Sequence, residues 1–258
     1  MKSFFTRKEP PPLDQASMLA LRQEREMWLA GEGGTHAREA FDALLVRLYG
    51  VWPRRGKKML VMNAGNDHFL HCLWQAGFDV TAQDDTPEFL QKARESLGNR
   101  AEYLLAAPNH LPCEGDTFDY VVVSGFEYWL DHAAVLQEIH RVVTGGVIIL
   151  FSNAFSLHRL GWKLCGSSPA GALGALPICP HKARNLFRRE FGASPQSWLS
   201  SLPGPAFFWK MGLANQINRW RMPLPLGAAA GARIDLLPQK GCTGIVIQAK
   251  QMYPAQGA

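Results

Sequence analysis

Short apolar runs alternate with helix-like stretches between residues 58 and 152, and this alternation constrains the fold more than any other feature. Each intervening stretch is long enough for a helix, and one begins with Thr86 as N-cap and Pro87 in the first turn. This order predicts a parallel, doubly wound α/β sheet that is covered by helices on both faces. Five strands are predicted: Lys58–Met62, Phe78–Gln83, Ala101–Leu105, Phe118–Ser124 and Gly146–Ser152.

Two helices are expected before the first strand. Residues 1–13 are basic and rich in proline, and we predict that they are disordered. The first helix is predicted over residues 13–30 with Asp14 as its cap, and Thr35 is expected to cap the second. Three glycines are expected to end the first helix: Gly31, Gly33 and Gly34.

The alternation becomes irregular after Ser152. The pattern still predicts a basic helix over Pro180–Phe191 and a last strand over Thr243–Lys250. One further strand is expected either near Ser197–Leu202 or near Ala228–Leu236. The sequence pattern leaves this choice open.

Charge is distributed unevenly along the chain. The whole protein has a net charge of +5, but residues 151–240 hold eleven Lys and Arg, two acidic residues and ten Phe and Trp. Two clusters, Phe207–Met211 and Asn218–Arg221, mix aromatic and cationic side chains. Three interpretations stay open: a cap with its aromatics packed inward, a surface for an amphipathic acceptor or a membrane, and, ranked last, a surface for single-stranded RNA.

Several classes of protein are disfavoured by length and composition. A chain of 258 residues can bury a full core, and its longest apolar stretch, Val142–Phe151, is too short to cross a membrane. No integral membrane segment is therefore expected. The five cysteines form no C-x-x-C pair, so neither a metal site nor a disulfide framework is expected, and we predict a cytoplasmic protein.

Polar residues follow the first two predicted strands. Gly65 lies in the turn after the first strand, ahead of a helix N-terminus that offers free N–H groups. Asp84 and Asp85 end the second strand about 20 residues later, where an acidic residue can accept both hydroxyls of a ribose. The structural alternative is that these two carboxylates stabilise the N-terminus of the next helix.

The order of several segments resembles that of the class I S-adenosylmethionine-dependent methyltransferases, specifically the type 11 group. The resemblance covers roughly residues 57–155. The matching stretches are Gly77–Asp84 with Thr86–Leu90, Leu111–Pro112 with Asp116–Val122, Glu138–Val143, and Gly145–Ile149.

This resemblance implies a seven-stranded, mostly parallel sheet, with S-adenosyl-L-methionine bound at the strand ends. It divides the chain into N-terminal helices over 14–56, a cofactor-binding core over 57–155, an acceptor lid over 156–225, and a C-terminal part over 226–258 that completes the sheet. By position, the implied cofactor-binding residues are Asn63, Ala64, Gly65, Asp84, Asp85, Asn109, Ser124, Gly125 and Phe126.

The first motif departs from the family pattern at four positions. The family usually has an acidic residue at Val61, glycines at Asn63 and Asp67, and an aspartate at Ala107. Two functions are therefore carried forward. The first is methyl transfer to a small or amphipathic acceptor, and the second is a methyltransferase-like binding or regulatory domain without catalysis.

Methyl transfer from a sulfonium depends mostly on proximity and alignment, and a base matters only when the acceptor must lose a proton. The sequence does not identify such a base. Four residues are candidates for this base, and for each of them a purely structural role is the alternative. They are His68, His132, Asn153 and His158.

Overall fold

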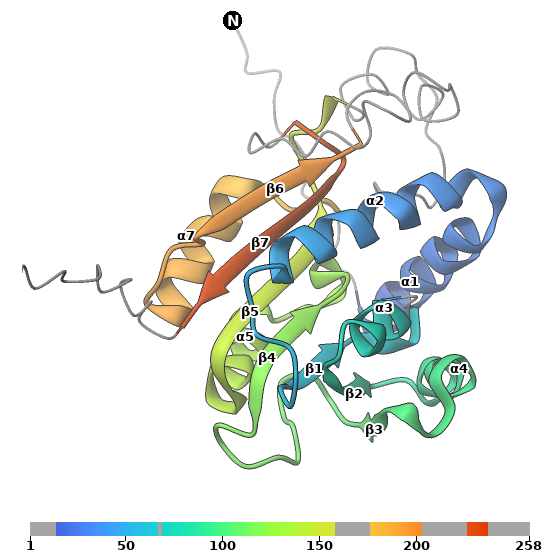
Figure 1. Ribbon diagram of the computed structural model, residues 1–258. Helices are drawn as coiled ribbons and strands as arrows, with labels where there is room; N and C mark the ends of the chain where they lie inside the picture. Colours follow the sequence, from blue (N-terminus) through green and yellow to red (C-terminus); the bar gives the residue numbers. More distant parts are fainter. Residues whose placement is uncertain (1–13, 67–68, 158–175, 203–225, 237–258) are drawn as a thin grey trace, which may run out of the picture.

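The computed structural model describes residues 14–66, 69–157, 176–202 and 226–236. Within these ranges the protein forms a seven-stranded sheet in the order β3-β2-β1-β4-β5-β7-β6 (Figure 1). Strand β7 runs antiparallel to both of its neighbours, and the other strands are parallel to one another. The strands are β1 (Lys58–Met62), β2 (Asp79–Asp84), β3 (Glu102–Leu105), β4 (Phe118–Val123), β5 (Val143–Ser152), β6 (Ser197–Ser201) and β7 (Ala229–Asp235).

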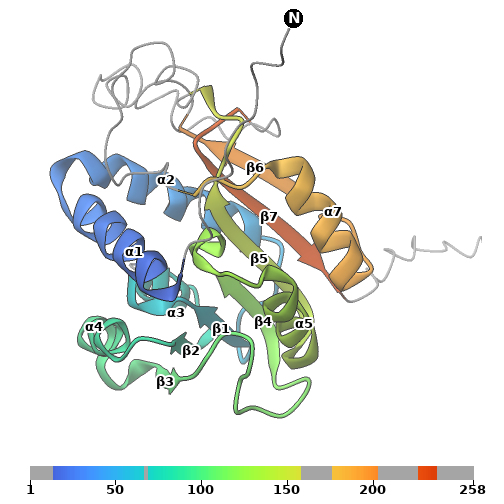
Figure 2. The ribbon, with the colours of Figure 1, turned by 180° about the vertical axis from the view of Figure 1, so that it is seen from behind.

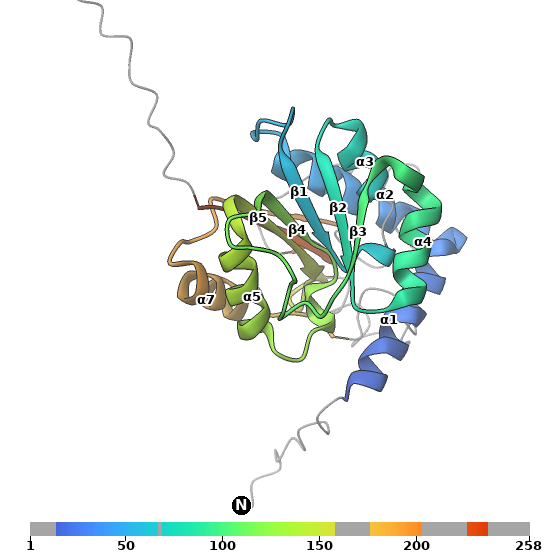
Figure 3. The same ribbon diagram turned by 90° about the horizontal axis from the view of Figure 1, so that it is seen from below.

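Helices cover both faces of the sheet, as the sequence predicts for strands that are apolar on both sides (Figure 3). In β1, Met59 and Val61 pack in the cluster with α2, α3 and α4, whereas Leu60 and Met62 pack in the cluster with α5 and α7. The helices are α1 (Gln15–Ala30), α2 (Glu32–Tyr49), α3 (Phe69–Gln75), α4 (Pro87–Leu97), α5 (His132–Val142) and α7 (Pro180–Phe191), with short 3-10 helices η1 (Ala64–Asn66), η2 (Gly98–Arg100) and η3 (Phe126–Tyr128).

Both candidate positions for the additional strand are strands in the structure. The segment near Ser197 forms β6 and the segment near Ala229 forms β7, so the described residues already make seven strands. The predicted strand over 243–250 and the predicted disordered tail over 1–13 lie outside the described residues. The structure describes only residues 156–157 and 176–202 of the predicted lid, and its part from 176 to 202 contains α7 and β6, which belong to the sheet layers.

The start of α2 differs from the prediction. Asp14 caps α1, accepting a hydrogen bond from the Ser17 backbone N–H at 2.9 Å, as expected. The expectation that Thr35 caps α2 is wrong, because α2 begins at Glu32 after Gly31. Gly34 lies inside α2 and allows close packing at the corner, since a Cβ on Gly34 would lie 2.4 Å from the Trp28 carbonyl oxygen. Glycine here allows two helices to touch.

Helix α1 lies beside α4, near the carboxyl ends of β1 and β2 (Figure 2). An ion pair joins Glu26 of α1 to Lys92 of α4, with 2.9 Å between the Glu26 Oε2 and Lys92 Nζ atoms. Only Leu29 is apolar among the three buried residues of α1, and the other two are Arg22 and Arg25. Charged contacts therefore hold a large part of this helix in place.

Two residues of α5 fix the loop that leads toward β4. Glu138 accepts a hydrogen bond from the Leu111 backbone N–H at 2.7 Å and forms an ion pair with Arg141. Arg141 in turn donates to the carbonyl oxygens of Cys113 and Leu111 at 2.9 and 3.1 Å. These bonds explain structurally why a Glu and an Arg three residues apart occur in this helix.

Glu138 should make stability depend on pH in the acidic range. The Arg141 side chain and the Leu111 N–H hold the pKa of Glu138 below its ordinary value of 4.5. Its stabilising effect is therefore complete above about pH 4.5 and is lost as pH falls through the lowered pKa. We expect Glu138→Gln to flatten this part of the stability curve, measured by urea unfolding at several pH values. An equally steep acid loss in the variant would contradict this assignment.

Candidate cofactor-binding site

The turn after β1 is shaped by Asn63 and Gly65. Asn63 has a left-handed backbone with φ of 58°, the conformation that the glycine usual at this position adopts without strain. Its side-chain amide donates to the Ser124 carbonyl oxygen at 2.8 Å, and its Oδ1 accepts from the Trp129 Nε1 at 3.3 Å. The Asn63 amide therefore hydrogen-bonds to the segment Ser124–Phe126, which the resemblance places under the methyl donor.

Gly65 is required by packing against α4. A Cβ at this position would lie 2.0 Å from the Cβ of Phe89, so no other residue fits without moving the helix. The Gly65 backbone N–H donates to Asp84 at 3.1 Å. The sequence suggested that this glycine lets a ligand approach the backbone, and the structure shows that Phe89 occupies its side-chain position. Ala64 beside it is fully buried.

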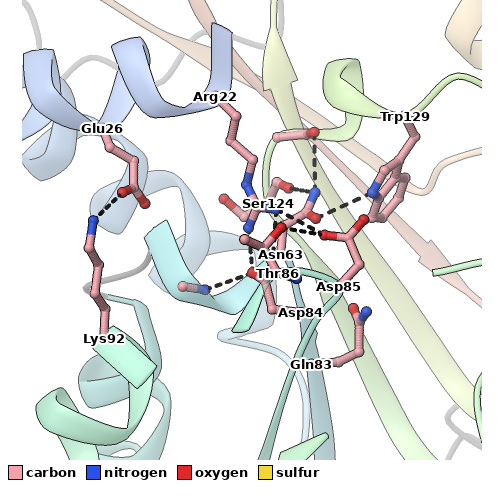
Figure 4. Close-up of polar contacts among 12 residues, drawn as sticks. Arg22, Glu26, Asn63, Gln83, Asp84, Asp85, Thr86, Lys92, Ser124 and Trp129 are labelled. Atoms are coloured by element: carbon pink, nitrogen blue, oxygen red, sulfur yellow. Dashed lines mark hydrogen bonds and ion pairs between the residues drawn. The ribbon is translucent and has the colours of Figure 1, made fainter. Parts of the chain in front are cut away.

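Asp84 is the centre of the polar network at the end of β2 (Figure 4). It is fully buried, and its Oδ1 accepts from the Thr86 backbone N–H at 3.0 Å and from Arg22 Nη1 at 3.1 Å. Its Oδ2 accepts from the Gly65 N–H and forms a close ion pair with Arg22 Nη2. Two backbone donors and both terminal nitrogens of one arginine thus surround a single carboxylate.

Arg22 reaches this carboxylate from α1, 62 residues earlier in the chain. Its guanidinium lies 4.2 Å from the centroid of the Phe89 ring, and a second, longer contact of 3.4 Å joins it to Asp85. Asp85 is partly exposed and also accepts from the Thr86 hydroxyl at 3.1 Å. Sequence reasoning missed Arg22, because nothing in the local pattern of α1 indicates a partner on β2.

A cavity of about 560 Å³ opens beside Asp85. Its walls include the loop 105–109, which follows β3, and the segment 128–131, which follows η3. Asn109 lines this cavity, and its role in binding the cofactor stays a prediction. A smaller hollow of about 90 Å³ connects the same region to Asn63 and Arg22. The larger space lies within the range of small-molecule sites, and its walls of apolar side chains with a few carboxylates suit a nucleoside.

The segment after β4 contains a buried carboxylate that sequence reasoning also missed. Ser124 and Phe126 are buried, and Gly125 adopts a left-handed backbone with φ of 61°. Glu127 follows them and is 4% exposed. Its Oε1 accepts from the backbone N–H and the hydroxyl of Ser152 at 3.2 and 2.6 Å, whereas its Oε2 has no hydrogen-bond partner. The only signal in the sequence is an acidic residue two positions after the glycine that follows the strand.

Two of the four base candidates, His132 and Asn153, lie within the described residues, and each makes a hydrogen bond to a different segment of the backbone. The Nε2 of His132 lies 3.0 Å from the Phe126 carbonyl oxygen, and burial lowers the pKa of His132 below 6.5. Asn153 is buried and donates to the Gly227 carbonyl oxygen at 2.8 Å, which ties the end of β5 to the segment before β7. His68 and His158 lie outside the described residues, as does Asp67, which stands where the family usually has a glycine.

The arrangement can be tested against the cofactor that the resemblance implies. Asp84 holds two N–H donors of Arg22 side by side, which is the pattern that two neighbouring ribose hydroxyls would present. The cavity beside Asp85 has room for the base. The donor chemistry therefore fits a nucleoside, with Arg22 standing where the ribose would bind.

The chain was compared with known proteins. Residues 60–151 match the family model described as a methyltransferase domain. An uncharacterised methyltransferase of Mycobacterium tuberculosis is 32% identical over 125 residues, which is 48% of each chain. The malonyl-[acyl-carrier protein] O-methyltransferase of Hamiltonella defensa is 36% identical over 100 residues, 38% of each chain. The chain thus spans about half, or less, of the length of these curated relatives.

Solved structures share the fold. A possible histamine N-methyltransferase from Thermotoga maritima superposes with a TM-score of 0.63 at 14% identity, covering 84% of this chain and 97% of the other. Magnesium protoporphyrin IX methyltransferase from Synechocystis, solved with bound S-adenosylmethionine, gives 0.58 at 11% identity, covering 88% and 99%. These identities are low, so the structures establish the fold alone.

Residues 60–151 thus match a methyltransferase domain, and the strand order is the one that the resemblance to class I S-adenosylmethionine-dependent methyltransferases implies. The resemblance seen in the sequence and the seven-stranded, mostly parallel sheet are thus confirmed. Among the described residues, no helix is long and apolar enough to cross a bilayer.

Neutralising Asp84 should destabilise the protein. Asp84→Asn leaves the buried Arg22 with only its longer contact to Asp85, and breaking a buried pair from one side costs about 3 kcal/mol. Asp85→Asn is the matched control because Asp85 is partly exposed and makes only the longer of the two contacts with Arg22. Urea unfolding measures both free energies. Equal and small losses in the two variants would show that the Arg22–Asp84 pair does not stabilise the fold.

Proposed function

We propose that this protein transfers a methyl group from S-adenosyl-L-methionine to a small or amphipathic acceptor. The observation that carries the proposal is Asp84, a buried carboxylate at the end of β2 that binds two adjacent donors beside a cavity of nucleoside size. The family match over residues 60–151 supports it. The bound cofactor would supply an electrophilic methyl group on sulfur.

In this proposal the residues of the chain hold and orient the cofactor. Asp84 accepts the ribose hydroxyls, and Asp85 and Asn109 flank the base in the larger cavity. Gly65, Ser124, Gly125 and Phe126 form the backbone beneath the methionine part. The hydrogen bond between Trp129 and Asn63 holds the turn after β1 against the segment that follows η3.

Glu127 is proposed to bind the acceptor. Its Oε1 is fixed by Ser152 at the end of β5, which leaves Oε2 to accept a hydrogen bond or a proton. A buried carboxylate repels another carboxylate and attracts an N–H or O–H donor. The acceptor should therefore be an amine or hydroxyl compound. The Hamiltonella relative is named for O-methylation of a malonyl-[acyl-carrier protein], which is a different acceptor.

Two further predictions from the sequence stay predictions: a cytoplasmic location and contact with an amphipathic or membrane surface. The exposed side of α7 supports surface contact, since it carries four cations at Lys182, Arg184, Arg188 and Arg189. The two clusters of aromatic and cationic residues, 207–211 and 218–221, lie outside the described residues. A role in binding RNA is ranked last.

The second candidate function is a methyltransferase-like binding or regulatory domain without catalysis. Two observations favour it. The amide of Asn63 already uses the Ser124 carbonyl oxygen, and Arg22 already uses both oxygens of Asp84. A domain that no longer binds the cofactor would satisfy its polar groups internally in this way. Cofactor binding separates the two functions.

S-adenosylhomocysteine should raise the melting temperature of the full chain. A ligand that binds only the folded state stabilises it by about 2.7 kcal/mol at a hundredfold excess over its dissociation constant. Asp84→Ala should abolish the shift, because the ribose loses its carboxylate. Asp79→Ala is the control, since Asp79 is exposed at the opposite end of β2. A wild-type protein that shows no shift at millimolar ligand would favour the non-catalytic function.

Glu127→Gln should reduce methyl transfer without weakening the fold. Glutamine keeps the shape of the side chain and an oxygen for Ser152, and it removes a buried charge. We expect an unchanged or higher free energy of unfolding, the same affinity for S-adenosylhomocysteine, and at least about a tenfold lower transfer rate. Transfer can be measured with radiolabelled S-adenosylmethionine and a panel of amines and alcohols. A variant that transfers at the wild-type rate would remove Glu127 from the acceptor site.

A further inference from the structure

We propose that α1 is a gate over the cofactor site and that Arg22 is the latch that keeps it closed. This inference rests on the proposed function, because it names Asp84 as the group for which Arg22 and the ribose compete. Arg22 and a bound cofactor would exclude each other. Cofactor binding would then require α1 to leave its position on β2.

The hydrogen-bonding capacity of Asp84 carries the argument. An ionised carboxylate has about four sites for donors. Asp84 fills them with the N–H groups of Gly65 and Thr86 and with two nitrogens of Arg22. The two backbone donors belong to turns that are fixed by the sheet. Arg22 is the donor that can leave, and a ribose diol can then take both of its places.

The attachment of α1 suits a movable element. It is held by the Arg22 pair, by Glu26 with Lys92, and by Arg25, whose guanidinium lies 5.7 Å from the centroid of the Tyr128 ring. Gly31 joins it to α2 in an extended conformation with ψ of 168°. A helix held largely by charged groups and connected through glycine can rotate as a unit about that residue.

Open space borders α1 near both of its ends. The cavity of about 560 Å³ includes Gln15 and Met18 in its wall, and a second cavity of about 540 Å³ includes Gln23, Glu26 and Met27. The Met27 side chain is 70% exposed. The part of the helix that carries Arg22 therefore borders open space, whereas Trp28 and Leu29 near its C-terminal end pack in the core.

Closing the gate protects the buried carboxylate in the absence of cofactor. Fully buried Asp84 would be costly without a cation or a set of donors. Arg22 supplies that partner, and its ring contact with Phe89 holds the guanidinium in place. Only molecules in the open state can then bind the cofactor. The apparent affinity is the affinity of the open state multiplied by the fraction of molecules that are open.

The test is calorimetric titration of the full chain with S-adenosylhomocysteine. Arg22→Met removes the competing donors, and the cofactor then relieves an unpaired buried charge. We expect the dissociation constant to fall by about tenfold or more. Lys92→Met is the matched control, because it removes a cation from the outer ion pair of α1 and leaves Asp84 untouched; its dissociation constant should change by less than about threefold.

Two measurements keep the test informative if Arg22→Met folds poorly. Arg22→Lys keeps the charge and gives up the paired donors, and should bind S-adenosylhomocysteine with intermediate affinity. In the wild-type protein, hydrogen exchange over residues 15–30 should become faster when the ligand binds, while exchange over 63–65 and 84–86 becomes slower. A helix that merely covers the bound ligand would show slower exchange instead.

The outcomes separate this inference from the proposed function. Wild-type binding with equal or weaker binding by Arg22→Met, or slower exchange in α1, would overturn the gate and leave the function standing. Failure of the wild-type protein and of every Arg22 variant to bind would overturn both. Binding by Arg22→Met and not by the wild-type protein would support both.

Discussion

The buried negative charge of Asp84 is the constraint on which the rest of the site depends. A carboxylate removed from water needs donors on both oxygens, and four groups from three different parts of the chain supply them. Because of this, the turn after β1, the first residues of α4 and the N-terminal helix converge at the end of β2. The position of α1 follows from this charge more than from its own apolar face, which contributes only Leu29 to the buried residues of that helix.

Much of the core could be predicted from the sequence because its signals are local. The strand β1 and the helix α7 have the predicted bounds, since an apolar run and a basic amphipathic pattern mark them directly. The predicted caps Asp14 and Thr86 both stand at the N-cap positions of their helices, although only Asp14 makes the side-chain bond to the helix. Gly34 misled the prediction because a glycine that ends a helix and one that allows close packing look alike in sequence.

The candidate site could be predicted only in part, for reasons of distance. The place of Asp84 follows from strand order, and the left-handed backbone of Asn63 follows from the glycine that usually stands there. The Arg22–Asp84 pair joins residues 62 positions apart, and Glu127 meets Ser152 across 25 positions. No periodicity or spacing encodes such contacts. Both depend on how the chain returns to the same edge of the sheet, which only the assembled structure shows.

Phe89 has a consequence for how this site can change during evolution. Its Cβ lies where a side chain at Gly65 would stand, and its ring lies beneath the guanidinium of Arg22. One aromatic residue therefore packs against the turn after β1 and also binds the Arg22 side chain of the N-terminal helix. A substitution at this position alters backbone packing and the hold on α1 together, so selection cannot adjust the one property while leaving the other untouched.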